Sequence, residues 1–196
     1  CLGDSVTGAC WLFRQGNAVR LQAVHMSNCW AGNGDYGMYF DGASNMTVSA
    51  AICIGNTKDG MFLNECNRMV ATNCILRDNN EAALSTVADI ALQNTIFSLF
   101  QSNMCDSATG VGKSIREVSS APGTSYGNMF GNNQLLNGSC QFTGASVTYR
   151  NSGFITENRG SATITAGGTT VTVTHGLSLT PPISSISITQ TSNPGA

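Results

Sequence analysis

The chain has 196 residues, of which 41% are hydrophobic and only 10% charged, and its formal net charge is −2. It has no basic run, so it lacks the electrostatic footprint of a nucleic-acid-binding protein, and no apolar run approaches the roughly 20 residues of a membrane span. The abundance of Gly, Asn, Ser and Thr favours an all-β protein with many turns.

Eight cysteines occur, an even number that permits disulfides, but their pairing cannot be read from the sequence. No Cys-x-x-Cys and no Cys/His pair at zinc-ligand spacing is present, and His25 and His175 are isolated, so we expect neither a metal site nor a cofactor. Two cysteines follow an asparagine, Cys29 in MSNCW and Cys74 in ATNCI. The cysteine positions are Cys1, Cys10, Cys29, Cys53, Cys66, Cys74, Cys105 and Cys140.

A repeat offers a structural explanation for the two Asn-Cys pairs. Four segments align, each alternating apolar with polar or small residues as a β-strand does. They are VHMSNCW from Val24, MTVSAAI from Met46, MVATNCI from Met69 and IALQNTI from Ile90. In this alignment Cys29, Ala51, Cys74 and Thr95 share one column, in which a small side chain suffices.

The same alignment places Asn28, Asn73 and Asn94 in a neighbouring column, where their amides would form a hydrogen-bonded ladder. A second repeated block is GNGDYGMYF (32–40) and GNTKDGMFL (55–63), with a weaker copy in NNEAALS (79–85). Its asparagines, at matching places, are Asn33, Asn56 and Asn79.

The second apolar positions of the four segments are 22, 23 and 21 residues apart. Repeats of about 21–23 residues with short strands and no helix predict an all-β chain that forms a right-handed parallel β-helix. Each repeat would be one coil, the coils would stack about 4.8 Å apart, and stacking would make the core. Leucine-rich repeats have a similar length, but this chain lacks their leucine consensus. The repeat loosens over 97–125, and residues 125–136 resemble a last coil that 146–153 closes.

Residues 18–136 resemble the right-handed β-helix superfamily with the pectate-lyase-like fold, through the strand starts GMYF and GMFL and the strands ending in Asn-Cys. Residues 157–193 resemble the small C-terminal β domain of many viral and bacterial β-helix proteins, through GSATITAG, TTVTVTHGL, TP and ISIT. That domain is common in phage tailspikes and tail fibres, which are trimers. We therefore predict a β-helix over 1–153 and a truncated C-terminal β module over 154–196.

The resemblance implies that any catalytic carboxylates lie on the outer wall of the coils. Asp35, Asp59 and Glu81 precede corresponding strand starts and are candidate catalytic residues. We expect Asp59 and Glu81 one coil apart, about 5 Å, and Asp35 and Glu81 two coils apart, about 10 Å. These separations fit either a retaining or an inverting glycosidase. The alternative is that the three are solvated turn residues that aid solubility.

Four further residues are candidate polysaccharide-binding residues. If the apolar residues beside them point inward, Tyr39 and Phe62 point outward on adjacent coils, where they suit the apolar faces of sugar rings. The alternative is that they are buried against another subunit. Arg77 and Asp78 are further polar candidates on the outer wall.

The leading functional hypothesis is a homotrimeric viral tailspike or related adhesin, located on a virion or outside the cell. It would bind a cell-surface polysaccharide, with depolymerisation as a further activity to test. One alternative is a secreted polysaccharide lyase or glycoside hydrolase that acts without a virion. Another is a purely structural fibre segment.

Overall fold

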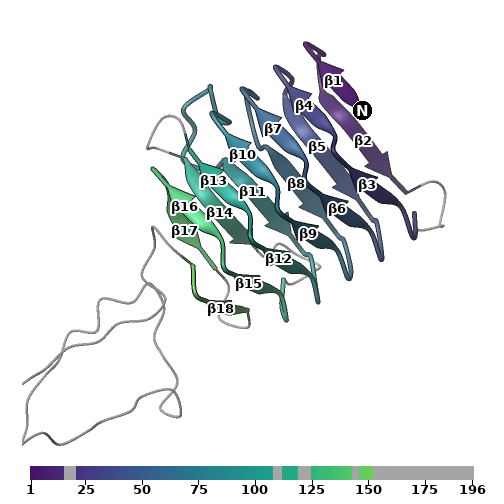
Figure 1. Cartoon of the computed structure of the whole chain (residues 1–196), viewed down its shortest axis with the longest axis vertical. Helices are drawn as coiled ribbons and strands as arrows, with labels where there is room; N and C mark the ends of the chain where they lie inside the picture. The colour runs from purple at the N-terminus through teal and green to yellow at the C-terminus, as the bar shows by residue number, and fades with distance from the viewer. Residues whose placement is uncertain (16–20, 108–111, 119–124, 143–145, 152–196) are drawn as a thin grey trace, which may run out of the picture.

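The structure, a computed structural model, describes residues 1–15, 21–107, 112–118, 125–142 and 146–151. Over these residues the regular elements are short strands, which form three parallel sheets of six strands each (Figure 1). The same residues contain no helix long and apolar enough to cross a membrane. The predicted C-terminal module lies outside them.

Each sheet runs the length of the stack, and its strands come from successive coils. Sheet 1 contains β1 (Leu2–Asp4), β4 (Trp30–Gly32), β7 (Ile52–Ile54), β10 (Ile75–Arg77), β13 (Met104–Asp106) and β16 (Gln134–Leu136). Sheet 2 contains β2 (Ala9–Arg14), β5 (Tyr36–Asp41), β8 (Met61–Asn64), β11 (Ala88–Gln93), β14 (Lys113–Val118) and β17 (Ser139–Gln141). Sheet 3 contains β3 (His25–Ser27), β6 (Thr47–Ser49), β9 (Val70–Thr72), β12 (Leu99–Gln101), β15 (Met129–Gly131) and β18 (Val147–Tyr149).

The chain visits the three sheets in turn, so each strand pairs in parallel with the strands three before and three after it. This is a parallel β-helix, and the predicted fold class is confirmed. Within the stretch where the repeat loosens, β12, β13 and β14 still contribute one strand to each sheet.

The core consists of inward-facing columns along the stack axis. In sheet 2, Met38, Met61, Ile90 and Ile115 form one buried column, because each is paired in register with the next. In sheet 3 the rings of Phe100 and Phe130 stack with centroids 5.2 Å apart. Burying a side chain of this size stabilises the fold by about 1.5–3 kcal/mol, and a single coil cannot bury such residues alone.

The fourth aligned repeat was placed in the wrong sheet. IALQNTI contributes to β11 of sheet 2, where Leu92 pairs with Leu63, and not to sheet 3. Thr95 lies in the column of Cys66, whose backbone N–H donates to Thr95 Oγ1 at 3.4 Å. The turn between β10 and β11 is lengthened over 78–87, so Phe100, not Leu92, pairs with Ala71 in sheet 3.

The first three copies of the Asn-Cys repeat are in the predicted register. Cys29, Ala51 and Cys74 form one inward column at the corner between sheets 3 and 1, and all three are buried. The asparagines before the two cysteines do not form the predicted ladder. Asn28 and Asn73 are exposed and have φ of 51° and 55°, a left-handed conformation that asparagine tolerates better than most residues. They turn the chain from one sheet into the next.

Amide ladders occur at other positions. The column of Cys29 and Cys74 continues as Asn103, Asn133 and Asn151, which are buried and hydrogen-bonded to one another. At the corner between sheets 1 and 2, Asn56 and Asn79 stack as predicted. The place expected for Asn33 is taken by Gly34, whose N–H donates to Asn56 Oδ1 at 3.1 Å.

Candidate functional site

Three aromatic side chains meet on the outer face of sheet 2. The ring centroids of Tyr39 and Phe62 lie 4.9 Å apart, and the ring of Tyr36 lies 5.3 Å from Tyr39 and 5.7 Å from Phe62. The residues that alternate with them, among them Met38 and Phe40, are fully buried. Because alternate residues of a strand face opposite sides of a sheet, Tyr39 and Phe62 point to the outer wall. The alternation is interrupted at Gly37 and Met38, which are both buried, so the ring of Tyr36 joins the other two on the outside, and all three rings remain partly exposed.

Charged side chains border this aromatic cluster. Lys58 Nζ lies 5.1 Å from the centroid of Tyr36, in a cation–π contact, and 3.3 Å from Asp35 Oδ2. On the other side Arg14 Nε lies 3.0 Å from Asp41 Oδ2. Both ion pairs are partly exposed, so their contribution to stability is small.

Asp59 is a buried acid at the edge of the cluster. It is 6% exposed, and its Oδ1 accepts a hydrogen bond from Ala88 N–H at 2.7 Å. Burial raises the pKa of Asp59 to about 6, against the Ala88 hydrogen bond and the nearby charges of Arg116 and Lys58, which lower it. An acid with a pKa in this range, beside a partly exposed aromatic surface, is a candidate for proton transfer.

Tyr36 shares this environment. Burial raises its pKa, the charge of Lys58 lowers it, and the charges of Asp59 and Asp35 raise it further. The charges of Lys58, Asp59 and Asp35 therefore all act on Tyr36, and Lys58 lies over its ring. The arrangement combines two proton-transfer groups, Tyr36 and Asp59, with two cations, Lys58 and Arg116, that could neutralise an anionic group of a ligand.

The structure brings two of the three predicted carboxylates to this site. Asp35 and Asp59 border the aromatic cluster, whereas Glu81 does not stack on Asp59 as expected. Ala88 occupies the position above Asp59, and the exposed Glu81 donates its N–H to Asn56 O in the lengthened turn. The expected separations of about 5 and 10 Å therefore do not apply, because the six residues 82–87 lie between Glu81 and β11.

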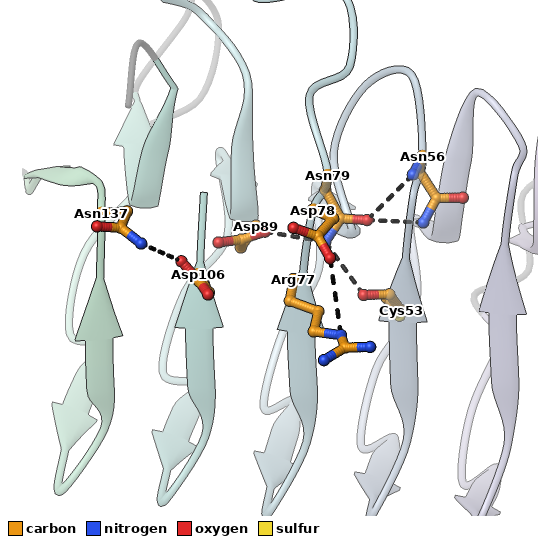
Figure 2. A network of polar contacts seen from close by, with 8 residues as sticks. All are labelled: Cys53, Asn56, Arg77, Asp78, Asn79, Asp89, Asp106 and Asn137. Atoms are coloured by element: carbon orange, nitrogen blue, oxygen red, sulfur yellow. Dashed lines mark hydrogen bonds and ion pairs between the residues drawn. The ribbon is translucent and has the colours of Figure 1, made fainter. Parts of the chain in front are cut away.

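Of the predicted binding residues, Tyr39 and Phe62 lie together as expected, and Arg77 and Asp78 lie elsewhere. Arg77 ends β10 in sheet 1, and its Nε is 3.7 Å from Asp78 Oδ2, with both side chains more than half exposed (Figure 2). They belong to a different wall of the coil from the aromatic cluster.

Sequence reasoning missed Tyr36, Lys58 and Arg116. A signal for Tyr36 and Lys58 was present in the second repeated block, where DYGM aligns with KDGM. This alignment puts Tyr36 at the place of Asp59 and Lys58 at the place of Asp35. Arg116 had no such signal, because no repeat fixed the register of β14. In the described residues no group of three or more His, Cys, Asp or Glu side chains is placed to hold a metal ion.

No family model matches the chain, and no curated protein matches it. Solved structures match the fold. The A-module of mannuronan C-5 epimerase AlgE4 from Azotobacter vinelandii superposes with a TM-score of 0.59 at 16% identity, over 73% of this chain and 43% of that one. A double mutant of the periplasmic alginate epimerase AlgG superposes with a TM-score of 0.56 at 13% identity, over 74% of this chain and 36% of that one. This chain thus spans less than half the length of either protein, and at these identities the likeness is one of fold.

Proposed function

We propose that the outer face of sheet 2 binds a polysaccharide and that Asp59 transfers a proton to or from the bound sugar. The observation that carries the proposal is the cluster of Tyr36, Tyr39 and Phe62, three partly exposed rings in mutual contact on one sheet face. Sugar rings present apolar C–H faces that pack on such a surface.

The polar groups around the cluster suit the hydroxyl and charged groups of a glycan. Arg14, Lys58 and Arg116 supply donors, and Asp41 supplies carboxylate oxygens. A site of this kind combines an apolar platform with a few placed polar groups.

Asp59 is the proposed proton-transfer group of this face. With a pKa of about 6 it is mostly deprotonated at neutral pH and is poised to accept a proton. We expect an activity that depends on Asp59 as base to rise with pH through about 6. The two structural neighbours are named as epimerases of mannuronan and alginate, which supports a polysaccharide as ligand and does not specify which one.

The biological setting that we propose is a homotrimeric tailspike or related adhesin, on a virion or outside the cell. The resemblance of residues 157–193 to the C-terminal domains of such proteins supports it. The molecular mass of the full chain by light scattering tests it, and a monomer at micromolar concentration would contradict it.

Binding is tested with the full chain on a panel of neutral and acidic glycans. We expect Phe62→Ala to weaken binding about tenfold, which corresponds to about 1.4 kcal/mol. Ile75→Ala is the control, because it truncates a partly exposed apolar side chain on sheet 1 and should leave binding unchanged. Equal binding by Phe62→Ala and the wild type would exclude this face as the binding site.

Proton transfer is tested by incubation with the glycans that bind, followed by assays for reducing ends, unsaturated products and C-5 epimerisation. Asp59→Asn should abolish turnover while binding persists, because the amide still accepts from Ala88 N–H but cannot take up a proton. Asp78→Asn, an exposed acid on another wall, is the control. Full turnover by Asp59→Asn would remove Asp59 from the mechanism.

A further inference from the structure

The outer face of sheet 3 differs from the other two in charge. Its six strands contain no Asp, Glu, Lys or Arg residue. Sheet 1 carries Asp4, Arg77 and Asp106. Sheet 2 carries Arg14 and several further charged residues, among them Arg116.

Large apolar side chains gather on this uncharged face toward the C-terminal end of the stack. Val70, Leu99, Met129 and Val147 occupy one outward row in strict register along sheet 3. Met129 is 43% and Val147 52% exposed. Exposed apolar clusters on soluble proteins mark interaction surfaces.

Two aromatic residues extend the row at the corner between sheets 2 and 3. Phe97 is 53% and Tyr126 40% exposed, and their rings meet edge to face with centroids 5.0 Å apart. Phe97 has a φ of 52°, which is unfavourable for a bulky residue. The fold therefore holds a large ring outward in a strained conformation. Together these six residues, Val70, Phe97, Leu99, Tyr126, Met129 and Val147, form what we call the sheet 3 patch.

We propose that the sheet 3 patch is the surface through which copies of this chain associate. The inference rests on the homotrimer of the proposed function and specifies its interface. Charge favours a second copy as the partner: the row of Val70, Leu99, Met129 and Val147 carries no charge, so two copies can meet there without burying an unpaired charge, which would be strongly unfavourable. Sheets 1 and 2 lack this property because charged residues lie on their outer faces. The exposed Arg68, beside Phe97, and Arg150, directly after β18, lie at the border of the row.

The geometry of the row suits a symmetric assembly. Val70, Leu99, Met129 and Val147 lie at successive coil heights along the stack, which Figure 1 shows as the row of β9, β12, β15 and β18. When parallel copies face a common axis, equivalent residues meet at the same height and pack in layers. Closed cyclic symmetry of this kind is the usual arrangement of homo-oligomers. The aromatic cluster of sheet 2 then stays open to a ligand, since it lies on a different wall.

The test compares the mass of the full-length wild type by light scattering with the masses of Met129→Lys and Val147→Lys. Both substitutions alter exposed side chains, so the coil should stay folded, which circular dichroism checks. We expect the wild type to be a trimer and both variants to shift to the monomer, with a threefold lower mass. Leu12→Lys, at an equally exposed apolar site on sheet 2, is the matched control and should remain trimeric.

Each other outcome overturns the proposal in a distinguishable way. Trimers in both lysine variants would leave the homotrimer intact and exclude this patch as its interface. A monomeric wild type would overturn the interface and the homotrimer together. If Met129 of that monomer also resisted oxidation by hydrogen peroxide, residues 152–196 of the same chain would be the cover in place of a second copy.

Discussion

The asparagine ladders at the two corners of sheet 1 are built alike and end differently. In the first, at the corner of sheets 3 and 1, Asn133 Oδ1 accepts from the N–H and the Nδ2 of Asn103, and Asn133 Nδ2 donates to Phe100 O and Asn151 Oδ1. Asn151 in turn donates its Nδ2 to Phe130 O at 3.0 Å. Every rung thus uses its amide both as donor and as acceptor.

The second ladder, at the corner of sheets 1 and 2, repeats this pattern for two rungs. Asn79 Oδ1 accepts from Asn56 Nδ2 at 2.7 Å, and Asn79 Nδ2 donates to Cys53 O at 3.1 Å (Figure 2). Its last rung is Asp89, whose Oδ1 accepts from Asn79 Nδ2 at 2.8 Å. Asp89 Oδ2 is buried and has no hydrogen-bond partner among the described residues.

The difference shows what an acid changes in an otherwise identical arrangement. An amide can pass the chain of donors and acceptors to the next coil, whereas a carboxylate only accepts. Burial raises the pKa of Asp89 well above its usual value, against the Asn79 hydrogen bond and with smaller contributions from Asp106 and Asp78. The second ladder therefore ends in a carboxyl group whose charge state should depend on pH, and the first does not.

Removing a central rung of the first ladder should have the largest effect. Asn133→Ala leaves Phe100 O and the N–H of Asn103 without their side-chain partner in a buried corner, and it removes one of the two bonds made by Asn103 Nδ2 and one of the two accepted by Asn151 Oδ1. At about 1–3 kcal/mol for each unsatisfied group, we expect a loss of about 3–5 kcal/mol in the free energy of unfolding by urea. Gln134→Ala, one residue along and exposed, should cost less than about 0.5 kcal/mol. Equal losses in the two variants would mean that the ladder does not stabilise the corner.

Crowding the second ladder should have the next largest effect. A Cβ at Gly60 would lie 2.6 Å from Asn79 Nδ2 and 2.8 Å from the backbone oxygen of Asp89. Gly60→Ala should therefore displace Asn79 and destabilise the fold by about 1–3 kcal/mol. A urea midpoint equal to that of the wild type would show that Asn79 can shift away from the new methyl group without loss of stability.

The pH dependence of stability should separate the ladders directly. Because the folded-state pKa of Asp89 is raised, the folded state binds more protons than the unfolded state above the unfolded pKa of 3.8. Stability should fall as pH rises from there, with a limiting slope of about 1.4 kcal/mol per pH unit for one proton, until the folded pKa is reached. Asp89→Asn should remove this component of the pH profile, whereas Glu65→Gln, at an exposed site, should not. An unchanged profile in Asp89→Asn would contradict the assignment.

Extending the first ladder by one rung should have the smallest effect. Cys74 lies directly above Asn103 in the same column, and its backbone N–H already bonds Asn103 Oδ1 at 2.9 Å. In Cys74→Asn the new Nδ2 can reach Asn103 Oδ1 and Val48 O, which Cys74 Sγ already faces at 3.9 Å. We expect a change of less than about 1 kcal/mol. Leu76→Asn, which buries an amide in an apolar column, should lower the free energy of unfolding by several kcal/mol. Similar losses in the two variants would show that an asparagine next to Asn103 does not extend the ladder.

Much of the fold followed from local pattern. Alternation at Met38–Phe40 and Met61–Leu63 identified two strands of one sheet, and the repeat placed Cys29, Ala51 and Cys74 in one column. The fourth copy failed because IALQNTI alternates equally well in either sheet, and the lengthened turn before β11 moves it from one to the other. Glu81 does not stack on Asp59 for the same reason. Asp59 and Tyr39 lie where the alignment placed them, because their coils have nearly constant length.

The sequence by itself determined that the chain is all-β and coiled, because a period of 22 or 23 residues with alternating apolar positions can bury its apolar side only by stacking coils. Only the tertiary structure decided which wall each side chain reaches. Residues as far apart in the chain as Asp59 and Arg116 come near each other through coil stacking, which depends on the summed lengths of all the turns between them. The Asn-Cys pairs illustrate both contributions. Their spacing predicted that the two cysteines share a column, and the structure adds that the asparagine before each cysteine adopts the left-handed conformation of the turn. Other asparagines form the ladders.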